Sequence, residues 1–109
     1  MISPMPLSTI LLTMFTAQLF DLATFIAMVR RLGPAAEANP VVLGVMTSGG
    51  VGAVIAVKLT LIVLVGAVAV VLNHGGDHRA RRAGALLLGC AILAGVFGGW
   101  TNALTIAAI

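Results

Sequence analysis

Three long apolar runs, separated by two short polar connectors, make up nearly the whole sequence. A helix needs about 20 apolar residues to cross the hydrocarbon core of a bilayer. The pattern therefore predicts an all-α integral membrane protein, in which a single domain of residues 1–109 holds three transmembrane helices. We expect these spans at about residues 7–30, 50–73 and 83–108.

The first connector predicts an additional short helix before the second span. It ends in Asn39-Pro40, a strong helix-start signal, because Asn accepts hydrogen bonds from free backbone amides and Pro fits the first helical position. A straight helix from Pro40 to Leu72 would be roughly 50 Å long, which exceeds the thickness of a bilayer. We therefore expect a short interfacial or re-entrant helix at about 40–48 and a bend at Gly49-Gly50.

Asp21 and Lys58 are the only ionisable residues inside the first two apolar runs. A charge inside the bilayer is costly unless it is paired or reaches water. Asp21 precedes Arg30 by nine residues and Lys58 follows Gly49 by nine. On antiparallel neighbouring helices, both residues would lie roughly 13 Å from the same membrane face. We therefore predict an ion pair between Asp21 and Lys58.

Three roles for this pair stay open. It could be a buried ion pair that fixes the register of two helices, a proton or ion relay, or a charged surface that faces a partner protein. Glu37 could fold back toward Lys58, pair with an arginine at the end of the first span, or lie in a capping loop. The candidate intramembrane polar cluster consists of Gln18, Asp21, Thr24, Glu37, Asn39, Lys58 and Asn102.

Small residues recur at helical spacing in the second and third spans. Such stripes let helix backbones approach closely in lipid. Because Lys58 lies on the opposite side of the second span from its stripe, we expect this helix to have two packing partners. The candidate packing residues are Ala53, Ala56 and Thr60 in the second span and Ala91, Gly95, Gly99 and Ala103 in the third.

Composition and charge support a membrane location. Of the 109 residues, 61% are hydrophobic and only 8% are charged, whereas soluble domains carry about 25% charged residues. The net charge of +3 comes from basic residues near span ends, where Arg79, Arg81 and Arg82 suit anionic lipid headgroups better than nucleic acid. The first run lacks a basic leader and exceeds the apolar core of a signal peptide, so we expect a retained span. We expect a multi-pass protein of the inner (plasma) membrane. The positive-inside rule then predicts that its N-terminus is cytoplasmic.

The sequence does not indicate catalytic or metal chemistry. His74, Asp77 and His78 place three possible ligands close together, but Gly75-Gly76 disfavours a rigid site and a fourth ligand is missing. The single cysteine, Cys90, excludes an internal disulfide and suits a packing role in the third run. The sequence contains no nucleophile–base set and no phosphate-binding glycine loop. We therefore expect neither enzyme activity nor a cofactor.

The sequence resembles a family of small uncharacterised prokaryotic membrane proteins whose pattern reads Asp…Thr…Gly…Glu-Ala-Asn-Pro…Lys. Over most of the chain, the matching residues are Asp21, Thr24, Gly33, Glu37-Ala38-Asn39-Pro40 and Lys58, with Asn102 in the last span. The resemblance implies a compact helical membrane domain whose polar residues meet within the bundle. It implies no particular activity.

These features favour a non-catalytic function. Two close-packing stripes exceed what a three-helix monomer needs, so we expect an accessory or scaffold subunit of a larger membrane complex. An alternative is an oligomeric proton or ion channel, or a transporter element, that uses Asp21 and Lys58. A second alternative is a holin-like phage membrane protein, although the charged C-terminal tail common in such proteins is missing. The expected partners are the lipid bilayer and other membrane subunits or further copies of the chain.

Overall fold

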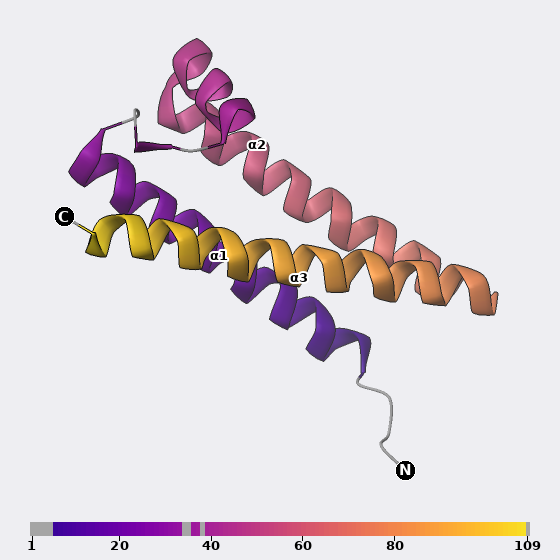
Figure 1. Ribbon diagram of the computed structural model, residues 1–109. Coiled ribbons are helices and arrows are strands. Elements are labelled where there is room, and N and C mark those ends of the chain that lie inside the picture. Colours follow the sequence, from indigo (N-terminus) through magenta and orange to yellow (C-terminus); the bar gives the residue numbers. More distant parts are fainter. Residues whose placement is uncertain (1–5, 34–35, 38, 109) are drawn as a thin grey trace.

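The computed structural model describes residues 6–33, 36–37 and 39–108, which form three long helices (Figure 1). They are α1 (Leu7–Leu32), α2 (Pro40–His74) and α3 (His78–Ala107). Each helix is long and apolar enough to cross a membrane, which confirms the prediction of three such segments. α1 and α3 run in roughly the same direction, and α2 runs in the opposite direction (Figure 1).

The residues that flank α1 explain where it begins and ends. Pro6 precedes the first turn in an extended conformation, and its carbonyl oxygen accepts a hydrogen bond from the amide of Thr9 at 3.0 Å. At the other end, Gly33 adopts a φ of 81° and donates its N–H to the carbonyl oxygen of Val29 at 2.9 Å. A positive φ favours glycine, because a side chain there would be strained. The helix therefore stops close to its predicted boundary.

α2 begins where Asn39-Pro40 predicted a helix start. The side-chain oxygen of Asn39 accepts hydrogen bonds from the amides of Val41 at 2.9 Å and Val42 at 3.4 Å. Gly50 then interrupts the helix with a φ of 79° and a ψ of −178°, a conformation that favours glycine. This break divides α2 into residues 40–49 and residues 51–74, and the two segments point in different directions (Figure 1).

α3 begins earlier than the sequence pattern predicted, at His78 and not at residue 83. The reason is Asp77, whose carboxylate accepts a hydrogen bond from the amide of Arg79 at 3.0 Å and caps the helix. Arg79, Arg81 and Arg82 therefore lie in the first turns of α3 and not in a loop. The acidic cap also offsets the unfavourable position of these cations near the positive end of the helix dipole.

The three helices pack unequally. The contact between α1 and α3 is the most extensive, whereas α2 touches α1 less and meets α3 near the short loop that joins them. Buried apolar side chains form two clusters, one joining residues 22–29 of α1 to the first part of α2, the other joining Met14 to α2 and α3. On α1, Gln18 and Asp21 lie between the two clusters. Polar groups thus form a layer between two apolar layers.

Candidate functional site

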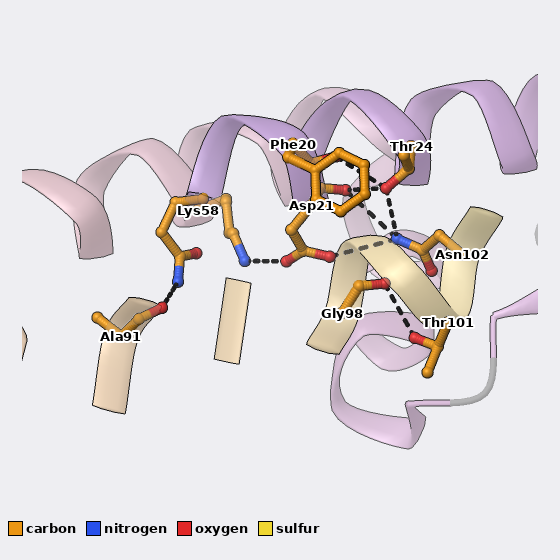
Figure 2. A network of polar contacts seen from close by, with 9 residues as sticks. Phe20, Asp21, Thr24, Lys58, Ala91, Gly98, Thr101 and Asn102 are labelled. Atoms are coloured by element: carbon orange, nitrogen blue, oxygen red, sulfur yellow. Dashed lines mark hydrogen bonds and ion pairs between the residues drawn. The ribbon is translucent and has the colours of Figure 1, made fainter. Parts of the chain in front are cut away.

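An ion pair lies at the centre of this polar layer. Lys58 Nζ of α2 donates to Asp21 Oδ2 of α1, which is the pairing that the matched positions of the two residues predicted (Figure 2). The Lys58 side chain is 25% exposed and the Asp21 side chain is 19% exposed. In a bilayer, an exposed fraction of this size faces lipid or a cavity, so mutual neutralisation lowers the free energy of both groups.

Asn102 connects the carboxylate of this pair to the third helix. Its amide nitrogen lies 3.2 Å from Asp21 Oδ1, 3.3 Å from the Asp21 carbonyl oxygen and 3.3 Å from Thr24 Oγ1 (Figure 2). The Thr24 hydroxyl in turn donates to the carbonyl oxygen of Phe20 at 2.8 Å. Asn102 is only 9% exposed. Side chains of α1, α2 and α3 are therefore joined in one polar network around Asp21.

Gly98 provides the space that the Asp21 carboxylate occupies. A methyl group at Gly98 would lie 2.5 Å from Asp21 Oδ1 and 2.8 Å from its Cγ, so only glycine fits here without a shift. Gly98 was not among the predicted packing residues, because the stripe of small residues in the third span passes through the neighbouring Gly99. The available signal was the spacing of Gly98 and Asn102, which are four residues apart and so share one helix face.

Gln18 makes a separate contact between α1 and α3. Its Nε2 donates to the carbonyl oxygen of Ala91 at 2.6 Å, and the side chain is buried. Gln18 was expected in the same cluster as Asp21, but the structure places it one helical turn away, against the backbone of α3. Its role here is to hold two helices together.

Two cavities lie next to the ion pair. The larger one has a volume of about 810 Å³ and the smaller one about 180 Å³. Lys58 lines both, together with Asp21 on the larger side and Gln18 on the smaller side. The pair thus occupies the boundary between the two spaces.

The first connector contributes Glu37 and Asn39 to the larger cavity, so the structure brings them to the same space as Asp21, Lys58 and Asn102. Glu37 Oε1 accepts a hydrogen bond from the backbone amide of Asn39 at 2.9 Å. Among the described residues, the Asp21–Lys58 contact is the only ion pair, so the alternative in which Glu37 pairs with an arginine at the end of α1 is not found there. The short reach of this local hydrogen bond keeps the carboxylate at the connector.

The small residues of α3 pack directly on α1. A methyl group at Gly95 would lie 2.7 Å from the backbone of Ala17, and one at Gly99 would overlap the ring of Phe20. Ala91 and Ala103 are half-buried in α3 at the same four-residue spacing. Such close approach is what a stripe of small residues allows.

The small residues of α2 have a different environment. Ala56 and Thr60 are exposed and Ala53 is half-buried, while the Thr60 hydroxyl donates to the carbonyl oxygen of Ala56 at 2.8 Å. Because the ion pair turns the Lys58 side of α2 toward α1, the stripe faces away from it. The close partner expected for this stripe is therefore neither α1 nor α3, and a partner outside the chain stays a prediction.

The basic residues at the start of α3 are all exposed, namely Arg79, Arg81 and Arg82. Their expected contact with lipid headgroups stays a prediction. The neighbouring Asp77 has a structural role, because its carboxylate caps the start of α3.

Together, fold and site define a class: a chain of three helices that can each span a membrane, tied together by a polar network beside two cavities. Comparison with protein-family models, curated proteins and solved structures gave no match to this chain. The resemblance based on the Glu37–Pro40 motif therefore stays a prediction, and Ala38 of that motif lies outside the described residues.

Proposed function

We propose that the protein moves a small solute or ion across a membrane, and that the Asp21–Lys58 pair is the gate. The observation that supports this proposal is the position of Lys58, which lines both cavities while it is bound to Asp21. An ionisable residue inside a membrane helix often marks the path of a solute or an ion. In this proposal the intact pair keeps the two cavities apart.

The two partners of the gate differ in how firmly they are held. Asp21 accepts from Asn102 and fits closely over Gly98, so its carboxylate is fixed by α3. For the Lys58 ammonium, the described residues provide one hydrogen-bond acceptor, which is Asp21. Lysine also has a long, flexible side chain. We therefore assign the movement that opens the gate to Lys58, which a competing cation at Asp21 would release.

We further propose that the three helices cross the plasma membrane with the N-terminus and the arginines of α3 in the cytoplasm. The segment 40–49 would then lie at the opposite interface, set off from the span by Gly50. Thiol labelling tests this orientation, because Cys90 is the only cysteine. In a Cys90→Ala background, Asp77→Cys should resist a membrane-impermeant thiol reagent added to intact cells. Labelling from outside would contradict the orientation.

A flux measurement tests the gate. Purified protein in liposomes should pass protons or monovalent cations, organic ammonium ions included, detected with enclosed fluorescent indicators. Asp21→Asn should abolish this flux, because it removes the carboxylate at which a passing cation displaces Lys58 and leaves the Lys58 ammonium to repel that cation. Asp77→Asn is a matched control, because it makes the same acid-to-amide change at an exposed helix cap. Flux through Asp21→Asn equal to that through the unchanged protein would refute the gate.

A second variant tests the same path without altering a charge. Val65 lines the smaller cavity, so Val65→Phe should fill it and reduce flux while the ion pair stays intact. Circular dichroism and size-exclusion chromatography establish that each variant is folded. Unchanged flux in folded Val65→Phe would exclude the smaller cavity from the path.

The accessory-subunit function is a second candidate, because the face of α2 around Ala56 and Thr60 is exposed. Its occupant would be a transmembrane helix of another subunit with small residues of its own, since only such a helix can approach this face closely. Extraction in mild detergent followed by size-exclusion chromatography tests it. A lone monomer with no partner would contradict this function and leave the transport function unaffected.

A further inference from the structure

The larger cavity has the size of a site for an organic molecule. Its volume of about 810 Å³ falls within the roughly 300–1,000 Å³ typical of small-molecule sites. A dehydrated inorganic cation needs oxygen ligands within about 2.6 Å on all sides and leaves most of such a space empty. The cavity is lined by residues of α1, α2 and α3 and by Glu37 and Asn39 of the first connector. Its geometry favours an organic ligand over a bare ion.

The charges that line this cavity do not cancel. Asp21 and Lys58 neutralise each other as a pair, which leaves the carboxylate of Glu37 as a surplus negative charge. A charge near an apolar environment is stabilised by a counter-charge. A ligand with one positive charge would complete the balance.

The walls of the cavity indicate the rest of the ligand. Phe25, Phe97 and Val54 provide apolar surface, whereas Asn102 and Thr101 provide polar groups. Aromatic rings also attract cations over their faces. An ammonium group can donate hydrogen bonds to carboxylates while an apolar body contacts the aromatic and aliphatic walls.

We propose that the larger cavity binds a primary or secondary ammonium ion that carries an apolar body, with Glu37 as its main counter-charge. The proposal builds on the transport function above by naming its solute class, whereas its test measures binding and not flux. The same ammonium chemistry occurs in free amphiphilic amines and in the headgroup of phosphatidylethanolamine. The test therefore has to separate these two sources.

Dansylcadaverine is a suitable probe, because it joins a primary ammonium to an aromatic body that reports binding by fluorescence. The full-length protein in phosphatidylcholine vesicles should bind it saturably, and dansylamide, which lacks the ammonium, should bind far more weakly. Glu37→Gln should weaken binding roughly ten- to a hundredfold, the effect of removing one charge-assisted hydrogen bond. Gln keeps an oxygen that can accept from the Asn39 amide, so the connector should stay in place.

Asp77→Asn is the matched control, since it removes the same charge at an exposed position far from the cavity. It should leave binding unchanged. Equal affinity of Glu37→Gln and the unchanged protein, or equal affinity for dansylcadaverine and dansylamide, overturns the proposal. Saturable, Glu37-dependent binding without any flux would uphold this site and refute the transport function.

Vesicle composition identifies the source of the ammonium group. If the natural ligand is a lipid headgroup, adding phosphatidylethanolamine to the vesicles should displace the probe from the unchanged protein. If it is a free amine, the lipid should leave binding unchanged, while a soluble amine such as dodecylamine should compete. Failure of both to compete would overturn the proposal, because the probe would then occupy some other site.

Discussion

The contact of α1 with α3 and the contact of α1 with α2 are built in different ways. Along α3, Gly95 and Gly99 let the two backbones meet, and Gln18 and Asn102 add buried hydrogen bonds. Along α2, apolar side chains meet and one flexible Lys58 side chain supplies the polar link. Tight backbone contact leaves little room for movement, whereas a single long side chain can release and rebind. We infer that α3 fixes the Asp21 carboxylate on α1, whereas the Lys58 side chain is the movable link between α1 and α2.

The largest effect should come from widening the rigid contact. Gly95→Ala places a methyl group 2.7 Å from the Ala17 backbone, which cannot turn aside as a side chain could. We expect a loss of about 3 kcal/mol in the free energy of unfolding, measured by circular dichroism during detergent denaturation. Gly89→Ala is the control, because its methyl group meets nothing within 4 Å. Equal stability of the two variants would show that α1 and α3 are not held by backbone contact.

Breaking the link to α2 should have the next largest effect. Asp21→Asn and Lys58→Met should each lower the free energy of unfolding by about 2 kcal/mol, less than the roughly 3–5 kcal/mol of a fully buried pair, because both side chains are partly exposed. The double variant should recover part of the loss, since it leaves no unpaired charge. Full tolerance of either single change would rule out a stabilising pair.

A smaller effect should come from the space beneath Asp21. Gly98→Ala should push the carboxylate away from Lys58 and Asn102 and lower the free energy of unfolding by about 1–2 kcal/mol. In an Asp21→Ala background the same change should have little effect, because the carboxylate is gone. Additive losses in a double-mutant cycle would show that Gly98 acts independently of Asp21.

The smallest effect on the chain itself should come from the exposed face of α2. Ala56→Leu should change the free energy of unfolding by no more than about 0.5 kcal/mol, because neither α1 nor α3 covers this position. The same variant should weaken association with another subunit, as measured by size-exclusion chromatography of native membrane extracts. A large loss of stability in the isolated monomer would mean that this face is packed within the chain.

The sequence predicted the features that depend on local pattern. Apolar run length located three helices, and Asn39-Pro40 located the start of α2 through the chemistry of a helix cap. Asp21 and Lys58 lie equally far along the sequence from Arg30 and Gly49, which mark the same membrane face, and this match was enough to predict their pairing. The early start of α3 could also have been predicted, because Asp77 is a favoured capping residue.

Features that depend on how the helices are rotated against one another could not be predicted. The spacing of small residues is similar in α2 and α3, yet only the stripe of α3 faces α1. The role of Gly98 and the two cavities follow from that rotation, because they exist only once Asp21 points at a particular face of α3. Periodicity identifies a face of a helix but does not identify its neighbour.

The distance in sequence between the two charges bears on how the chain enters the membrane. Asp21 leaves the ribosome 37 residues before Lys58, so α1 reaches the insertion machinery while its carboxylate is still unpaired. Partitioning a lone carboxylate into lipid is unfavourable, whereas a neutral hairpin partitions readily. We therefore expect α1 to remain in the translocon until α2 has been synthesised, and the two helices to enter the bilayer together.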